Sequence, residues 1–210
     1  SDFISYPRNK KNDIKTLKKL KVDYLYLPTF KDIYEFKTKN RVFLDKVSKQ
    51  LCGKYRKNHF KGVLNVVNRF IEIIKPKYIF MGKKDYQQLY LIKRHISKNK
   101  MKSEVIECNT VREKNGVACS SRNGRLDQKG VKIASNIYHY IFKFKKKMKR
   151  KFNTNNIIHL KKRIIEMGAN KIDYLENYDI KKFKKSNKIN KDNNLFIAYY
   201  IKNVRLIDNI

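Results

Sequence analysis

Apolar residues between positions 62 and 75 recur every three or four residues, the period of an amphipathic α-helix. The pattern predicts a helix over residues 62–75 that ends at Pro76, because proline has no backbone N–H to continue the hydrogen-bond ladder. The apolar positions are Val63, Val66, Val67, Phe70, Ile71 and Ile74. The fully apolar run at residues 78–81 that follows is typical of a short buried strand.

Helical spacing resumes through Leu89, Ile92 and Ile96, and residues 104–108 read as a second strand. Strands that alternate with helices of this length predict a βαβ unit and a parallel sheet, whose ligands gather at the carboxyl ends of the strands. Residues 82–85 lie at such an end, with Asp85 at the expected N-cap of the next helix. Backbone N–H groups and the helix dipole favour an anion there.

The rest of the chain carries shorter patterns. They predict a helix at 12–20, a strand at 22–27, a hairpin at 111–119 turned by Asn115-Gly116, a helix at 129–149, and strands at 195–200 and 204–210. The change of character near Thr110 predicts two domains, residues 1–110 and 111–210. The lysine clusters at 145–151 and 181–191 are interpreted as solvated faces or loops.

The chain is strongly basic, with 52 Lys and Arg against 18 Asp and Glu and a net charge of +34. Such a balance by itself favours a nucleic-acid or anionic membrane partner. However, the excess residue types (Lys, Asn, Ile, Tyr and Phe) have A/T-rich codons and are spread along the whole chain. The base composition of the genome is therefore the favoured cause, and a basic nucleic-acid-binding module stays the alternative hypothesis.

Neither a membrane span nor a metal centre is indicated. No apolar segment is long enough to cross a bilayer, and no signal-peptide pattern is present. Cys52, Cys108 and Cys119 are far apart and not in CxxC spacing, which favours reduced thiols in the cytoplasm over disulfides or a zinc site.

Four motifs occur in a fixed order along the chain. They are RKNHFKGV at 56–63, FMGKKDYQQL at 80–89, TVREKNGVACSSRN at 110–123 and RLIDNI at 205–210. Together they resemble the pantothenate synthetases, the pantoate–β-alanine ligases, whose patterns look like R-x-x-H-F-x-G-V, F-x-G-E-K-D-x-Q-Q-L, T-V-R-E-x-x-G-L-A-x-S-S-R-N and L-I-D-N-I. The resemblance extends over essentially the whole chain.

The resemblance implies an α/β protein, in which a Rossmann-like nucleotidyltransferase domain (1–110, with its N-terminal part lacking) is joined to a smaller α+β lid domain (111–210). It also implies an ATP-dependent ligase that acts with Mg²⁺, forms pantoyl adenylate and pyrophosphate from pantoate, and then transfers the acyl group to β-alanine. A cytoplasmic homodimer with no membrane or nucleic-acid partner is expected. The alternatives are a nucleic-acid-binding module on a degenerate scaffold of this fold, or an adenylyl-transferring relative that uses another acid.

Matched position by position, the resemblance divides the site residues by substrate. ATP binding is expected at Gly82, Lys83, Lys84, Asp85, Val111, Cys119, Ser120, Ser121 and Arg122, and pantoate binding at Gln88, His59 and Arg56. The expected catalytic groups are Lys84, Ser120, Ser121 and Arg122, since cations and hydroxyls offset charge on phosphates. Lys83 stands where the family has glutamate, and Cys119 where it has Leu or Met.

One family motif, P-T-M-G-x-L-H-x-G-H, is not found in the 210 residues. We therefore expect the chain to lack an N-terminal segment, to expose an unpaired sheet edge, and to have little ligase activity alone.

Overall fold

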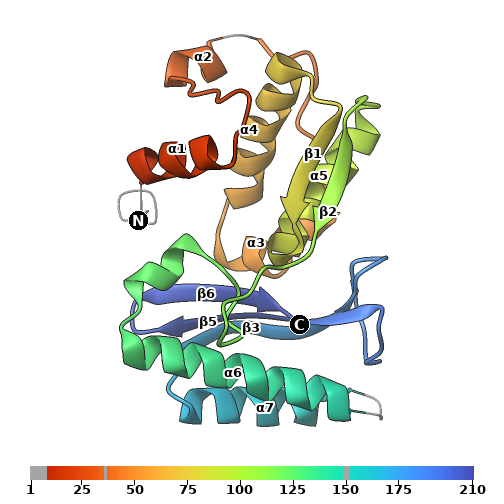
Figure 1. The fold of residues 1–210 in the computed structure, drawn as a ribbon. Helices are drawn as coiled ribbons and strands as arrows, with labels where there is room; N and C mark the ends of the chain where they lie inside the picture. Colours follow the sequence, from red (N-terminus) through yellow and green to blue (C-terminus); the bar gives the residue numbers. More distant parts are fainter. Residues whose placement is uncertain (1–8, 36, 149–151) are drawn as a thin grey trace.

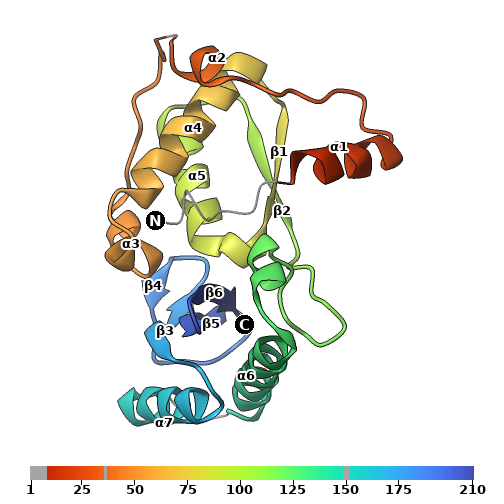
Figure 2. The same ribbon diagram turned by 90° about the vertical axis from the view of Figure 1, so that its left-hand side faces the viewer.

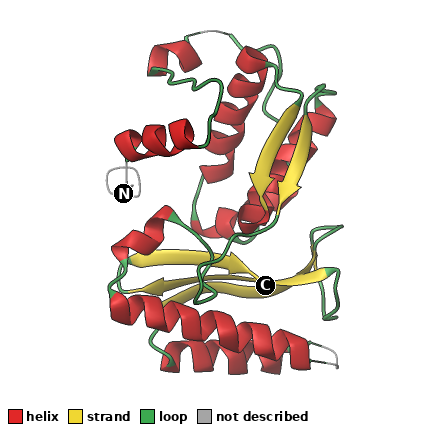
Figure 3. Ribbon diagram, viewed as in Figure 1, coloured by secondary structure: helices red, strands yellow, loops and turns green. Residues whose placement is uncertain are grey.

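The computed structural model of the chain describes residues 9–35, 37–148 and 152–210, which form two lobes (Figures 1 and 3). The N-terminal lobe holds a two-stranded parallel sheet, β1-β2, among helices. The C-terminal lobe holds a four-stranded antiparallel sheet in the order β4-β3-β5-β6. Within the described residues, no helix has the length and apolar character needed to cross a membrane.

The N-terminal lobe is built around the predicted βαβ unit. Its elements are α1 (Lys10–Lys19), α2 (Phe30–Tyr34), η1 (Lys46–Lys49), α3 (Cys52–Tyr55), α4 (His59–Ile74), β1 (Tyr78–Gly82), η2 (Lys83–Asp85), α5 (Tyr86–Lys98) and β2 (Glu104–Cys108). Strands β1 and β2 are parallel, with Tyr78 opposite Glu104 and Gly82 opposite Cys108. The predicted parallel pair is thus confirmed, and α4 begins at His59 rather than at the predicted residue 62.

The start of α5 differs from the prediction. Asp85 occupies the N-cap position, but its side chain makes no capping hydrogen bond to the helix. The short 3₁₀ turn η2 lies between the strand and the helix, and the Asp85 carboxylate instead lies 3.6 Å from the Lys84 ammonium. The carboxylate is therefore paired with a neighbouring cation instead of with the helix end.

The predicted strand at residues 22–27 is wrong, because that segment has no regular secondary structure and no strand partner in the described residues. Its side chains are exposed, and Tyr24 reaches 92% exposure. A β-rich sequence forms a strand only where a neighbouring strand takes up its backbone hydrogen bonds.

The C-terminal lobe begins with the predicted hairpin. Only one bridge, between Arg112 and Ala118, forms there, and Gly116 takes a φ of +86° in the turn. The elements that follow are η3 (Ser121–Arg125), α6 (Gln128–Lys147), α7 (Thr154–Glu166), β3 (Lys171–Asp179), β4 (Lys184–Lys185), β5 (Asn193–Ile201) and β6 (Val204–Asn209). The predicted helix at 129–149 corresponds to α6, with residue 149 outside the described residues, and the two predicted C-terminal strands are β5 and β6.

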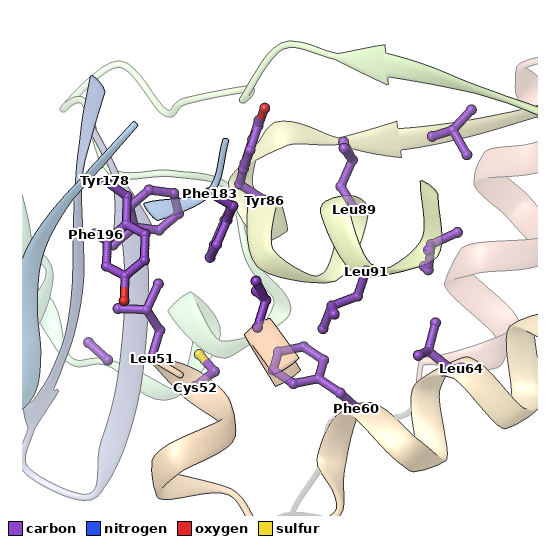
Figure 4. Close-up of a cluster of buried hydrophobic side chains, with 14 of the residues drawn as sticks. Leu51, Cys52, Phe60, Leu64, Tyr86, Leu89, Leu91, Tyr178, Phe183 and Phe196 are labelled. Atoms are coloured by element: carbon purple, nitrogen blue, oxygen red, sulfur yellow. The ribbon is translucent and has the colours of Figure 1, made fainter. Parts of the chain in front are cut away.

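The antiparallel sheet lies between two cores. Figures 1 and 2 show α6 and α7 on one face of the sheet and the N-terminal lobe on the other. Because side chains alternate along a strand, Leu195 and Ile197 of β5 join the core with α6 and α7, whereas Phe196 joins the core of the N-terminal lobe. Figure 4 shows Phe196 with Tyr178 and Phe183 in the core shared with the N-terminal lobe. One sheet thus completes both cores and fixes the position of the two lobes.

Candidate active site

A cavity of about 340 Å³ lies where the two lobes meet. It is lined from the N-terminal lobe by Arg56, Lys84 and Asp85 and from the C-terminal lobe by residues that include Ser120 and Arg122. A smaller pocket of about 40 Å³ shares Arg56, Lys84 and Asp85 with it. Two motifs that are distant in the sequence therefore contribute side chains to one site.

The corner at residues 82–85 is positioned by the end of β1 and by η2. The Lys84 side chain is 17% exposed, and its ammonium lies 3.6 Å from the Asp85 carboxylate. A Cβ atom at Gly82 would meet no protein atom within 4 Å. The glycine is therefore not required by protein packing.

The segment at residues 120–123 enters the cavity from the opposite lobe. The Ser120 hydroxyl accepts a hydrogen bond from the Arg122 backbone N–H at 3.2 Å, which starts η3. The Asn123 side chain donates to the Ala118 carbonyl at 3.0 Å and to the Glu113 carboxylate at 2.7 Å. These bonds tie the serine-arginine segment to the preceding hairpin.

The smaller pocket brings together the three residues that were expected to bind pantoate. Arg56, His59 and Gln88 all line it. The Arg56 guanidinium lies 2.8 Å from Nε2 of His59, and a guanidinium only donates hydrogen bonds. Nε2 must therefore accept, which makes the imidazole neutral with its proton on Nδ1.

Five of the expected ATP-binding residues do not line either pocket: Gly82, Lys83, Val111, Cys119 and Ser121. The Lys83 ammonium instead donates to the Asn109 side chain at 3.2 Å and lies 3.8 Å from the Glu107 carboxylate. The Val111 carbonyl accepts from the Cys119 N–H at 2.9 Å, and both side chains are exposed.

Cations predominate among the charged groups of the main cavity. Its lining contains Arg56, Lys84, Arg122, Arg125 and Arg205 as cations and Asp85 and Asp208 as anions. Arg112 neutralises Asp208 by a bidentate pair at 2.7 and 3.0 Å. Although burial lowers the pKa of Arg112, the Asp208 carboxylate raises it above its usual value overall. Arg205 is in turn paired with the buried Asp173 carboxylate at 2.8 Å. The other lining cations still outnumber Asp85, and this excess of positive charge favours a polyanionic ligand.

The described residues contain no cluster of three or more His, Cys, Asp or Glu side chains suited to a metal ion. Asp85 is the cavity carboxylate that is not held by an arginine in a bidentate pair. One such carboxylate fits Mg²⁺, which is usually bound by one or two carboxylates together with substrate phosphates.

Sequence reasoning missed Gln87, the neighbour of Gln88. Its buried amide donates to the carbonyls of Val47 and Gln50 at 2.9 and 2.8 Å and accepts from the Cys52 N–H at 3.1 Å. These three bonds hold the turn that leads into α3 and Arg56. Both glutamines of the motif thus line the smaller pocket, and Gln87 also supports its wall.

Comparison with known proteins identifies the family. A sequence profile of the family described as Pantoate-beta-alanine ligase matches residues 1–210. The chain belongs to the pantoate–β-alanine ligase family. A pantothenate synthetase from Sulfurihydrogenibium sp. is 36% identical over 212 residues, an alignment that covers the whole chain and 76% of that protein.

Solved structures agree with this assignment. The pantoate-β-alanine ligase of Francisella tularensis, determined in complex with beta-gamma ATP and β-alanine, is 34% identical with a TM-score of 0.79, and the match covers the whole chain and 72% of that protein. The pantothenate synthetase of Thermus thermophilus is 26% identical with a TM-score of 0.85, over the whole chain and 77% of that protein. The predicted α/β fold class with a Rossmann-like nucleotidyltransferase domain is confirmed.

Proposed function

We propose that the interlobe cavity is where this member of the ligase family joins pantoate to β-alanine at the expense of ATP. The observation that carries the proposal is that Lys84 from one lobe and Ser120 and Arg122 from the other line the same cationic cavity. The Francisella tularensis relative, solved with beta-gamma ATP and β-alanine, supports the same ligands here.

In the first step, a carboxylate oxygen of pantoate attacks the α-phosphorus of ATP. The bond from that phosphorus to the bridging oxygen breaks, and pyrophosphate leaves. No protein nucleophile is needed, so the residues act by holding two anions together and by offsetting the charge on the phosphates. Lys84 and Arg122 supply cations from opposite sides, and Ser120 supplies a hydroxyl donor.

Pantoate is assigned to the smaller pocket beside the phosphates. Gln88 offers both a donor and an acceptor to its hydroxyl and carboxylate groups, and Arg56 supplies positive charge. His59, whose Nε2 accepts from Arg56, holds that guanidinium in place. The shared wall of the two pockets, Lys84 and Asp85, then places the carboxylate next to the α-phosphate.

In the second step, the β-alanine amine attacks the acyl carbon of pantoyl adenylate. The bond from that carbon to the phosphate oxygen breaks, AMP leaves, and the amine loses a proton. Mg²⁺ bound to the phosphates, when present, would further offset their charge, and Asp85 is the residue proposed to face it.

The experiment separates the two steps by their substrates. In protein that also carries the family's P-T-M-G-x-L-H-x-G-H motif, exchange of labelled pyrophosphate into ATP is expected to require pantoate alone, and AMP release to require β-alanine as well. Exchange supported equally by unrelated carboxylic acids would instead indicate a relative with another substrate. Exchange with no acid dependence at all would refute the proposed chemistry.

The remaining expectations concern the setting of the enzyme. We propose a cytoplasmic homodimer, supported by the family resemblance, and free cysteines at positions 52, 108 and 119 fit a reducing compartment. Sedimentation and cell fractionation test these points. The nucleic-acid-binding alternative gains no support from the relatives, which are named as ligases or pantothenate synthetases.

A further inference from the structure

No step of the reaction described so far uses the closing motif at residues 205–210, yet its penultimate side chain, Asn209, reaches the backbone of the corner at residues 82–85. The buried Asn209 amide nitrogen donates to the carbonyls of Lys83 and Lys84 at 2.8 and 2.9 Å. Strand β6 is therefore hydrogen-bonded to the backbone that carries the Lys84 side chain. Asn209 does not line the cavity, so it acts on a ligand only through Lys84.

The orientation of the Asn209 side-chain amide depends on a second side-chain amide, that of Asn194. Asn209 can hold two carbonyls only with its nitrogen toward them, because an amide oxygen there would face two other acceptors. The Asn194 nitrogen donates to the Asn209 oxygen at 2.9 Å, which keeps the Asn209 nitrogen on the far side. The orientation of Asn209 is therefore set by Asn194.

Asn194 is in turn oriented by Lys145. The Lys145 ammonium donates to the Asn194 side-chain oxygen at 3.0 Å, to the Asn193 carbonyl at 2.5 Å and to the Ile210 backbone oxygen at 2.9 Å. Burial lowers the pKa of Lys145 to about 8, so at neutral pH the group remains mostly an ammonium that only donates. A donor at this point forces the Asn194 oxygen toward Lys145 and its nitrogen toward Asn209.

This geometry corrects the interpretation of the lysine cluster at 145–151 as solvated at one residue. The Lys145 ammonium is hydrogen-bonded at the end of the sheet, whereas Lys146 and Lys147 are exposed as expected. Residues 149–151 of that cluster lie outside the described residues. We propose that Lys145, Asn194 and Asn209 form an amide relay that positions Lys84 for phosphate binding. The relay starts at a donor-only group and ends on two backbone carbonyls, and each amide in it has one allowed orientation.

The decisive variant is Asn194→Asp. A carboxylate keeps, and strengthens, the contact with Lys145 but has no hydrogen to donate to Asn209. If the Asn209 amide keeps its orientation, its oxygen faces a carboxylate oxygen of the new aspartate. If the amide turns over, its oxygen faces the Lys83 and Lys84 carbonyls, and the two hydrogen bonds to them are lost. Asn187→Asp is the matched control, since Asn187 is exposed on the same lobe and undergoes the same charge change.

Two measurements test the relay. Hydrogen–deuterium exchange of a peptide covering residues 80–88 is expected to rise about tenfold in Asn194→Asp and Asn209→Ala, as the loss of one or two hydrogen bonds allows. The rate of pantoate-dependent pyrophosphate exchange is expected to fall about tenfold in the same variants. The KM for β-alanine, measured by AMP release, is expected to be unchanged. Asn187→Asp and Lys143→Met, an exposed position on α6, should match the wild type in both.

The outcomes separate positioning from folding. Wild-type exchange and kinetics in Asn194→Asp and Asn209→Ala would overturn the proposal. It would also be overturned if Lys145→Met lowered the melting temperature while both asparagine variants stayed normal, because Lys145 would then be merely structural. Should Asn194→Asp fail to fold, Asn209→Ala decides alone. The kinetic measurement rests on the proposed function and is made on protein that also carries the family's P-T-M-G-x-L-H-x-G-H motif. Absence of pantoate-dependent activity in that protein would refute the proposed function, whereas the amide exchange would still test the relay.

Discussion

Replacing Lys84 by alanine removes one cation from the wall that both pockets share. A unit charge about 4 Å from a phosphate oxygen interacts with it by about 4 kcal/mol at an effective dielectric constant near 20. Asp85, 3.6 Å from the ammonium, already offsets part of that charge. The remaining loss of about 2.7 kcal/mol corresponds to a fall of about a hundredfold in the adenylation rate.

Lys83→Ala is the matched control, because it removes a lysine side chain from the adjacent residue. The Lys83 ammonium is engaged with Asn109 and Glu107 rather than with the cavity, so we expect a change of about threefold or less in the same assay. Pantoate-dependent pyrophosphate exchange would be measured for both variants, with melting temperatures to confirm folding. Equal losses in the two variants, or an unchanged rate in Lys84→Ala, would refute the assignment of the phosphate contact to Lys84.

Three further predictions concern the walls of the site and the stability of the N-terminal lobe. Gly53→Ala should prevent stable folding, since its Cβ would overlap the Ser48 carbonyl; soluble yield and circular dichroism would show it, and a normal melting curve would contradict it. Gln87→Leu should lower the free energy of unfolding by about 2–4 kcal/mol, because it leaves buried backbone groups without partners; denaturant titration measures this, and a loss below about 0.5 kcal/mol would count against it. Burial lowers the pKa of His95 from 6.5 despite the nearby Glu72 carboxylate, so below about pH 6.5 the unfolded chain binds the proton first and stability falls by up to about 1.4 kcal/mol per pH unit. His95→Gln should remove that part of the pH dependence, and an identical dependence in the variant would show that another group causes it.

The βαβ unit was predictable because its strands are continuous apolar runs and its helices keep a clear period. Helix α7 and strand β3 were not predicted, since polar and charged residues interrupt their apolar positions. In α7 only Leu160 and Ile164 are buried, and in β3 the burial alternation is broken by an irregularity between Ile172 and Tyr174. Short buried stripes of this kind are set by tertiary packing, which a single sequence does not display.

The candidate site was predictable to the extent that its residues stand in motifs. Lys84, Arg122 and Gln88 were expected from the resemblance of their motifs to those of the family, and all three line the pockets. Arg125 and Asp208 also lie in or next to the quoted motifs, but nothing in the pattern distinguishes them from neighbours that point elsewhere. The contact between Asn209 and the lysine carbonyls joins residues more than a hundred positions apart, and only the folded chain displays it.

The antiparallel sheet that completes both cores makes the two lobes a single cooperative unit. Swinging them apart would expose Tyr178, Phe183 and Phe196, which are each 4% exposed or less, at a cost of about 1.5–3 kcal/mol for each side chain. Neither lobe is therefore expected to be stable when expressed without the other.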